Sequence, residues 1–242
     1  MQDNVTNEAL RRDGYAVVKN VVDAGEVSRL RQALSLRNHR RANLRNVFSA
    51  VPESVRVLRH PGVRACIRAS LGTNAFAVRA ILFDKTADAN WLVAWHQDTA
   101  IPIQEPLDTA QLPPGYGPQS VKDGVPHCRA SENLLADMLT LRLHLDDCGE
   151  ENGPLRVIPG SHALGRLEDH KIENARRQTE PVSVLAAAGD ALLMRPLTLH
   201  ASSQSDRPGH RRVLHVEFAH KQLPEPLRWH ERQYLFHPGF PR

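Results

Sequence analysis

Apolar and polar residues follow two different periods along this chain, and the change between them predicts its architecture. Over the first 74 residues, apolar side chains recur every three or four positions, as on the buried face of a helix. Three helices are expected there: residues 4–13, a helix capped by Asp23 with Val27, Leu30 and Leu34 on one face, and residues 61–71. The β-branched residues 14–22 predict a strand between the first two helices.

From residue 75 onward the pattern is that of strands, with alternating or short β-branched apolar runs. The expected strands are residues 75–83, 91–98, 138–147, 154–162, 181–185, 190–196 and 211–219. The Pro- and Gly-rich residues 101–133 show neither period, which predicts a long loop, either a functional lid or a disordered segment. Many strands after N-terminal helices predict a mainly β fold with flanking helices, a sandwich or barrel.

Length and composition are those of an ordinary globular domain. We divide the 242 residues into a helical support (1–74), a β core with the lid loop (75–220) and a C-terminal tail (221–242). The sequence has no run of 18 apolar residues, no signal-peptide pattern and no C-x-x-C pair among its three cysteines. We therefore expect a cytoplasmic protein, monomeric or homodimeric, with no membrane partner.

The chain is mildly basic, with a formal net charge of +4. Its densest basic stretch, residues 37–45, contains no aromatic residue on which a base could stack, which argues against a nucleic-acid partner. The stretch is either a solvated helix end or loop, or a patch that receives an anionic substrate.

Two of the expected strands carry polar residues on one face, because residues two apart in a strand point the same way. In residues 138–147 the leucines share the buried face, and the opposite face holds Thr140, Arg142, His144 and Asp146. In residues 211–219 the side chains expected to face the site are Arg211, Val213, His215 and Glu217. Parity therefore directs Arg211 toward the barrel mouth, and Arg212 away from it.

Two His-x-Asp pairs, His96–Asp98 and His144–Asp146, are each able to grip one ion from a single strand. Together with a distal histidine, such a pair holds three adjacent positions of a six-coordinate Fe(II) and leaves three open. In a double-stranded β-helix, the jelly-roll or cupin-like barrel, four strands separate the pair from the distal histidine. Four expected strands lie between His96 and His200 but only three between His144 and His200, so the first pair is selected.

The strings W-H-Q-D at 95–98 and E-N-G-P-L-R-V-I-P-G-S-H at 151–162, followed by His200 and Arg211, resemble the phytanoyl-CoA dioxygenase family of Fe(II)/2-oxoglutarate-dependent oxygenases. The opening D-G-Y-A-V-V-K-N-V-V-D-A-G-E-V is also similar to the N-terminus of that family, so the resemblance covers nearly the whole chain. The P-G-S-H segment is its most distinctive part, because His-x-Asp recurs by chance. The resemblance implies a double-stranded β-helix backed by the N-terminal helices.

The resemblance also implies a role for individual residues. His96, Asp98 and His200 match the iron ligands, and Arg211 matches the arginine that pairs with the C5 carboxylate of 2-oxoglutarate. Further positions that match contacts to this cosubstrate are Ser202, Arg142 and Ile81. The implied reaction uses O2 to hydroxylate or otherwise oxidise an unactivated C–H bond of a small molecule, with release of succinate and CO2. Ascorbate is the expected reductant in vitro.

Other polar and aromatic residues are candidates for contact with the prime substrate: His144, Trp95, Arg79, Lys122 and Arg129. His144 is alternatively a neighbour that supports the metal ligands, and Trp95 is alternatively a packing residue. Arg79 is expected on the same strand face as Ile81, and the lysine and second arginine belong to the expected lid.

Two other functions are compatible with such a barrel. A cupin-like metal-dependent hydrolase or isomerase would use the metal as a Lewis acid and would not need Arg211. A non-catalytic small-molecule-binding barrel would keep the fold and lose a metal ligand, whereas this sequence keeps all three. Consumption of 2-oxoglutarate coupled to succinate formation would separate the oxygenase from both.

Overall fold

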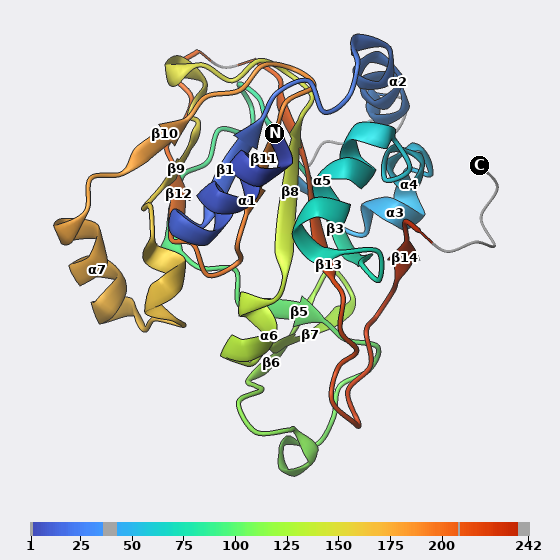
Figure 1. Ribbon diagram of the computed structural model, residues 1–242, viewed down its shortest axis with the longest axis vertical. Coiled ribbons are helices and arrows are strands. Elements are labelled where there is room, and N and C mark those ends of the chain that lie inside the picture. Colours follow the sequence, from blue (N-terminus) through green and yellow to red (C-terminus); the bar gives the residue numbers. More distant parts are fainter. Residues whose placement is uncertain (1, 36–42, 208, 237–242) are drawn as a thin grey trace.

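The computed structural model describes residues 2–35, 43–207 and 209–236, and its centre is a pair of antiparallel sheets (Figure 1). The large sheet has the order β1-β11-β8-β13-β3-β14, with β2 also paired to β3. Its strands are β1 (Tyr15–Val18), β2 (Asn43–Leu44), β3 (Phe76–Lys85), β8 (Leu139–His144), β11 (Ala191–Met194), β13 (Arg211–Ala219) and β14 (Gln233–Tyr234). The small sheet has the order β10-β9-β12-β4, formed by β10 (Val182–Val184), β9 (Leu155–Val157), β12 (His200–Ser202) and β4 (Val93–His96). This is the jelly-roll core that the sequence predicts.

The interior between the two sheets is apolar at one end. There Leu192 and Met194 of β11 form a buried cluster with residues of β9 and β10, namely Leu155, Val157 and Val184.

Four strands of these two sheets, β8 to β11, lie in sequence between the His96 strand and the His200 strand. This confirms the number of strands that the sequence predicted between the two histidines.

The N-terminal helices cover the large sheet, as predicted (Figure 1). They are α1 (Gln2–Arg12), α2 (Ala24–Ser35), α3 (Val47–Ala50), α4 (Glu53–Val57) and α5 (Pro61–Leu71). Asp23 caps α2, since its Oδ1 accepts a hydrogen bond from the Glu26 amide at 2.9 Å. The leucines of β8 and the apolar face of β13 are buried beneath these helices. This confirms which face of each of the two strands was predicted to be apolar and buried. No helix among the described residues is long and apolar enough to cross a membrane.

The prediction of a structureless segment at 101–133 is wrong. It contains β6 (Gln119–Lys122), β7 (Val125–Arg129) and most of β5 (Ala100–Pro102), which form a third sheet in the order β5-β7-β6. We call these three strands the lid sheet. Asp123 and Gly124 form a two-residue hairpin turn with φ of 47° and 80°, and this Asp-Gly pair was the signal for the hairpin.

The lid sheet has its own apolar core below the jelly roll (Figure 1). Ile101, Ile103 and Cys128 are fully buried there together with Phe76 of β3, and α6 (Glu132–Ala136) closes one side. The residues expected as a C-terminal tail also pack into this core, through Leu223, Leu227 and Trp229. The remaining elements are α7 (Asp169–Gln178), beside the small sheet, and the short 3-10 helices Thr109–Gln111, Glu150–Asn152 and Ser161–Leu164.

Candidate active site

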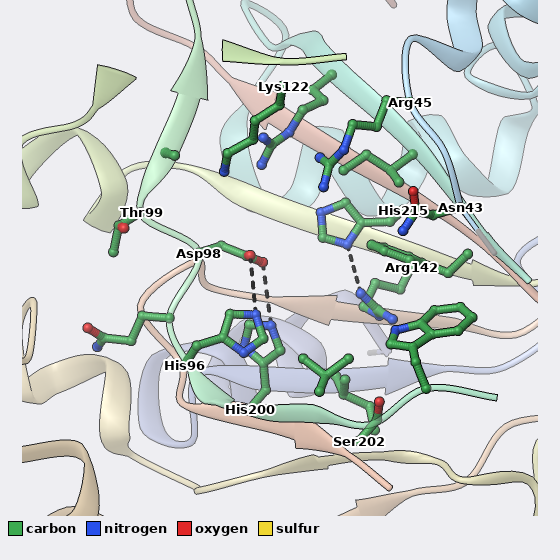
Figure 2. Close-up of a pocket in the computed structure, with 18 of the residues that line it drawn as sticks. Asn43, Arg45, His96, Asp98, Thr99, Lys122, Arg142, His200, Ser202 and His215 are labelled. Atoms are coloured by element: carbon green, nitrogen blue, oxygen red, sulfur yellow. Dashed lines mark hydrogen bonds and ion pairs between the residues drawn. The ribbon is translucent and has the colours of Figure 1, made fainter. Parts of the chain in front are cut away.

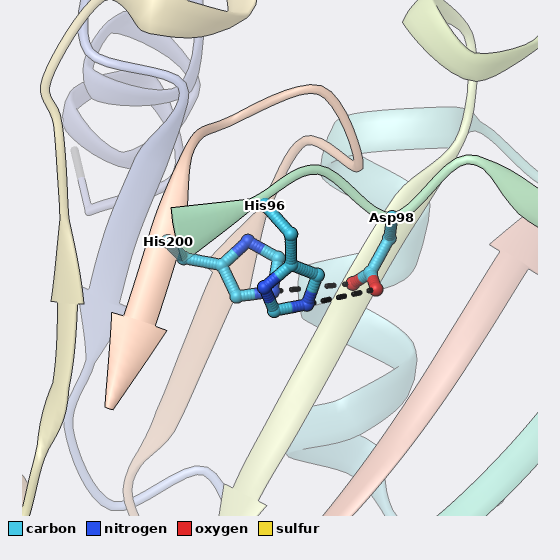
Figure 3. A group of neighbouring side chains, drawn as sticks. All are labelled: His96, Asp98 and His200. Atoms are coloured by element: carbon cyan, nitrogen blue, oxygen red, sulfur yellow. Dashed lines mark ion pairs between the residues drawn. The ribbon is translucent and has the colours of Figure 1, made fainter. Parts of the chain in front are cut away.

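Three side chains converge where the small sheet opens (Figure 3). His96 ends β4, His200 begins the neighbouring β12, and the two residues are directly paired in the sheet. Asp98 follows β4 and turns back toward both rings, with its carboxylate oxygens 3.9 Å from His96 Nε2 and 3.6 Å from His200 Nε2. One ligand atom from each of the three residues lies within 4.8 Å of the other two, close enough for all three to bind one metal ion.

Backbone carbonyls orient both histidine rings. His96 Nδ1 lies 2.8 Å from the Ala94 carbonyl oxygen, and His200 Nδ1 lies 2.9 Å from the Thr198 carbonyl oxygen. In each case the Nδ1–H group donates, so the lone pair of Nε2 points to the common centre. Such outer hydrogen bonds hold the tautomer and ring angle that a metal ligand needs.

The protonation states also fit a metal. Burial lowers the pKa of His200 to about 3, so this imidazole is neutral at physiological pH. Burial alone would raise the pKa of Asp98, but the neighbouring histidines and Arg79 outweigh it and keep the carboxyl ionised. Asp98 Oδ2 is buried and has no hydrogen-bond partner among the described residues. Two imidazole nitrogens and one carboxylate with an unpartnered oxygen are a donor set suited to Fe(II).

The three residues form part of the wall of a cavity of about 350 Å³ (Figure 2). All four residues that match cosubstrate contacts also line it: Arg211, Arg142, Ser202 and Ile81. Arg211 donates from Nη1 to the Gly153 carbonyl at 2.7 Å, and its buried Nε has no hydrogen-bond partner among the described residues. Arg142 donates to His215 Nδ1 at 2.8 Å. A buried arginine with a free N–H group is suited to an incoming carboxylate.

Sequence reasoning missed Lys85, a buried cation beside this arginine pair. Its Nζ is 3.3 Å from Ser202 Oγ and also donates to the Ser203 carbonyl, while Arg211 is its direct partner across β13 and β3. Burial lowers its pKa to about 8, and the charges of Arg211 and Arg142 act in the same direction. The expected strand stopped at residue 83, two residues before Lys85, whereas β3 ends at Lys85. Alternation places Lys85 on the same strand face as Arg79 and Ile81, and this was the sequence signal that could have identified it.

A second group of possible metal ligands lies next to the first, and it includes His215 and Glu217, which were expected to face the site. Asp98, His215 and Glu217 also have ligand atoms within 4.8 Å of one another. Glu217, however, already accepts hydrogen bonds from Arg79 and from His215 Nε2, so its charge is compensated. The His96–Asp98–His200 group is therefore the better candidate for a metal.

Three candidates for substrate contact do not line the cavity, which corrects the sequence analysis. Trp95 points to the opposite face from His96, as alternation requires, and lies under the guanidinium of Arg156 beside α7. Arg129 is exposed and donates to the Gly117 carbonyl, and His144, buried at the end of β8, is not among the lining residues.

Asp146, expected on the same face as His144, is also placed differently. β8 ends at His144, and Asp146 turns outward to form ion pairs with Arg212 and Arg31. Arg79 and Lys122 do line the cavity, as expected. Residues 37–42 of the basic stretch lie outside the described residues, but its last member, Arg45, lines the cavity.

A jelly roll that combines two histidines, one aspartate and a buried arginine pair around one cavity defines a class of metal- and 2-oxo-acid-dependent enzymes. The model of the Phytanoyl-CoA dioxygenase (PhyH) family matches residues 10–213, and the chain belongs to this family of iron- and 2-oxoglutarate-dependent enzymes. Among curated proteins, the dioxygenase cnsJ of Penicillium expansum is 27% identical, over 94% of this chain and 69% of that protein.

Solved structures share the fold. The epimerase SnoN from nogalamycin biosynthesis, in complex with Fe3+, alpha ketoglutarate and nogalamycin RO, superposes with a TM-score of 0.69 at 21% identity, over 90% of this chain and 83% of SnoN. EctD from S. alaskensis, with 2-oxoglutarate and 5-hydroxyectoine, gives a TM-score of 0.66 at 18% identity, over 88% and 74% of the two chains. At these identities the similarity establishes the fold and leaves the reaction of this chain open.

Proposed function

We propose that this chain is an Fe(II)- and 2-oxoglutarate-dependent oxygenase that hydroxylates an unactivated C–H bond of a small molecule and releases succinate and CO2. One observation carries the proposal. His96, His200 and the unpartnered Asp98 oxygen converge in the same cavity as Arg211, a buried arginine with a free N–H group. A metal-dependent hydrolase or isomerase needs the first group but has no use for the arginine.

The residues divide the work between the two sheets. His96, Asp98 and His200 would hold the iron and leave three of its six positions for cosubstrate and O2. Bound iron supplies the activation of O2, which amino-acid side chains cannot perform. Arg211 would hold the far carboxylate of 2-oxoglutarate, with its guanidinium anchored by the Gly153 carbonyl. Ser202 lines the same cavity.

Buried residues shield part of the cavity from water, which would limit side reactions during turnover. Arg211 and His200 are buried, so the cosubstrate end of the cavity is shielded from solvent. The lid sheet contributes Lys122 to the opposite part of the wall, and we expect substrate to enter between that sheet and the jelly roll. Exclusion of water would protect the oxidising species until the substrate is in place.

The first test is binding. Anaerobic protein with Fe(II) and 2-oxoglutarate should show the weak visible metal-to-ligand charge-transfer band of an iron-bound 2-oxo acid, and His200→Ala should abolish it. A band of unchanged strength in this variant would refute the ligand assignment.

The second test is turnover. A metabolite extract, incubated with protein, iron, ascorbate and 2-oxoglutarate, is searched by mass spectrometry for products that gain one oxygen atom, with succinate measured in parallel. Succinate formation with products of unchanged oxygen content would retain the enzyme class and overturn hydroxylation. A metal-dependent product formed without 2-oxoglutarate would favour the hydrolase or isomerase.

A further inference from the structure

One part of the cavity wall is not used by the metal or the cosubstrate, and it is strongly basic. Its cations come from three elements: Arg45 after β2, Arg79 in β3 and Lys122 at the end of β6. We call these three residues the basic wall. Figure 2 shows Lys122 and Arg45 together at one side of the cavity, with Ser202 at the opposite side.

The charge of the basic wall is only partly compensated. Arg79 is paired with Glu217, and Arg45 lies 3.5 Å from Asp123, a carboxylate that is 45% exposed and therefore screened. Lys122 forms no ion pair with any described residue. Asp98, a proposed metal ligand, is the only acidic residue among the described residues that line the cavity.

The three cations are close enough for each positive charge to disfavour the charged form of its neighbours. Burial lowers the pKa of Lys122, and the charges of Arg79 and Arg45 lower it further. Burial and the charge of Arg79 likewise lower the pKa of Arg45. Repulsion of this kind in a half-buried wall is relieved when an anion binds.

2-Oxoglutarate is not that anion. In the proposed function its two carboxylates would be held elsewhere, one at the metal and the other at Arg211. Arg211, Arg142 and Lys85 form a separate basic group, held by Gly153, His215 and Ser202 respectively. The basic wall is thus left for a different ligand.

We propose that the basic wall binds an anionic oxygen group of the prime substrate, a carboxylate or a phosphate ester, and so directs the carbon to be oxidised toward the metal centre. This inference rests on the proposed function, since it assigns the remaining part of the same cavity to the second substrate. Charge-assisted hydrogen bonds from Arg45 and Lys122 would supply both affinity and orientation.

The test uses three probes of similar shape: phenylacetate, its neutral amide phenylacetamide, and phenyl phosphate. Each is titrated calorimetrically, without O2, into protein loaded with Fe(II) and 2-oxoglutarate, whose charge-transfer band reports the loading. At least one anionic probe should bind about tenfold or more tightly than phenylacetamide, and the preference should weaken at high salt. The better anionic probe identifies whether the site prefers carboxylate or phosphate.

Charge-removing variants locate the binding site. Lys122→Gln and Arg45→Gln should each weaken the anionic probe by about fivefold or more and leave phenylacetamide unchanged. Lys171→Gln on α7 and Arg56→Gln on α4 remove the same charges from exposed positions and should have no effect. Should Arg45→Gln fail to fold, Lys122→Gln, at a strand end, still decides the question.

Three results would overturn the inference: equal affinity for the amide and both anions, wild-type affinity in both charge-removing variants, or loss of the charge-transfer band as the anion displaces 2-oxoglutarate. If wild-type protein shows no band at all, the proposed function fails. If the band forms and no anion is preferred, only the basic wall assignment fails.

Discussion

Two adjacent arginines show how a single residue position decides between structure and chemistry. Arg212 points away from the cavity and forms a two-pronged contact with Asp146, with Nε and Nη2 each 2.8 Å from a carboxylate oxygen. Arg211 points inward, where its Nη1 binds a carbonyl and its Nε has no hydrogen-bond partner among the described residues. The first arginine is satisfied by the fold, and the second is prepared for a ligand.

We therefore expect Arg211→Ala to raise the apparent 2-oxoglutarate constant by about 30-fold or more. Truncation of one partner of a buried, charge-assisted pair costs roughly 2–5 kcal/mol, and each 1.4 kcal/mol is a factor of ten. Titration of the charge-transfer band measures the change. Iron affinity should be nearly unchanged, because this arginine is not a metal ligand.

Arg212→Ala is the matched control. It should lower stability by breaking the contact with Asp146 but leave the 2-oxoglutarate constant within about threefold of wild type. The assignment of the inward face of β13 would be wrong if Arg212→Ala were the variant with weak cosubstrate binding.

Site residues were predictable where parity or a motif placed them, and not where packing did. His96 and Arg211 lie on strand faces that alternation defines, and Asp98 follows the first of these strands. His200 was placed by the motif, since its strand, β12, was not among the expected strands. Lys85 was missed because the apolar run that marks its strand ends before it. Whether a half-buried arginine faces the cavity or the solvent depends on contacts between distant segments, which one sequence does not show.

At the scale of elements, Asp190 connects the start of β11 to the end of β1. Its side chain is 2% exposed and accepts hydrogen bonds from Lys19 Nζ and from the amides of Asn20 and Ala187, at 2.8–2.9 Å. We expect Asp190→Asn to lower the free energy of unfolding by about 2 kcal/mol or more, because charged acceptors of buried amides are costly to replace. Denaturant unfolding measures the loss. Asp147→Asn, an exposed acceptor of the Ala188 amide, should cost about half as much or less.

This contribution should depend on pH. Burial raises the pKa of Asp190, but its hydrogen bonds outweigh burial and the net pKa is lowered. A carboxyl with a lowered pKa stabilises the fold above its unfolded pKa of about 3.9, and the benefit disappears as the pH falls further. The difference between wild type and Asp190→Asn should therefore shrink below about pH 4. A constant difference down to pH 2 would contradict the assignment.

The hairpin of β6 and β7 allows a second test at the scale of elements, of whether its turn positions Lys122. Gly124 has φ of 80°, and an added Cβ there would meet no atom within 4 Å, so the main cost of a substitution is backbone strain. We expect Gly124→Val to cost about 1–2 kcal/mol of stability and to weaken binding of the anionic probe through displacement of Lys122. The charge-transfer band should be unaffected. Asp123→Asn retains a favoured turn sequence and should leave stability within about 0.5 kcal/mol.

Elements with regular periods were predictable, and the lid sheet was not. The leucines of β8 and the helix that begins at Pro61 follow simple periods, and both elements form where expected. β5 ends at Pro102 and β7 contains Pro126, and both strands are so short that their apolar residues show no period. Their burial against Phe76 and Trp229 becomes visible only in the folded chain. The many prolines and glycines of residues 101–133 favoured a loop, and the hairpin that the Asp-Gly pair indicates was therefore not predicted.

At the scale of the whole molecule, the site is built across the two sheets. The small sheet carries His96 and His200 on β4 and β12, and Asp98 follows β4. The large sheet carries Arg211, Arg142 and Lys85 on β13, β8 and β3. The lid sheet adds Lys122 from a third direction. The relative position of metal and cosubstrate is therefore set by the packing of the jelly roll, which the helices and apolar clusters hold together independently of the site.

Removal of the metal should consequently leave the protein folded. The three apolar clusters that join helices to the large sheet, sheet to sheet, and lid sheet to β3 contain none of His96, Asp98 and His200, and both histidine rings are held by backbone carbonyls. Protein treated with a chelator should unfold cooperatively. Fe(II) at about 100 times its Kd, without O2, should add about 2.7 kcal/mol of stability, a rise in Tm of about 5–11 °C for a domain of this size.

The control is His96→Ala, which lacks one of the three proposed ligands. This variant should unfold near the Tm of the metal-free protein and show no rise in Tm when Fe(II) is added. Loss of cooperative unfolding after chelation would show that the metal is structural, and an equal rise in His96→Ala would place the iron elsewhere.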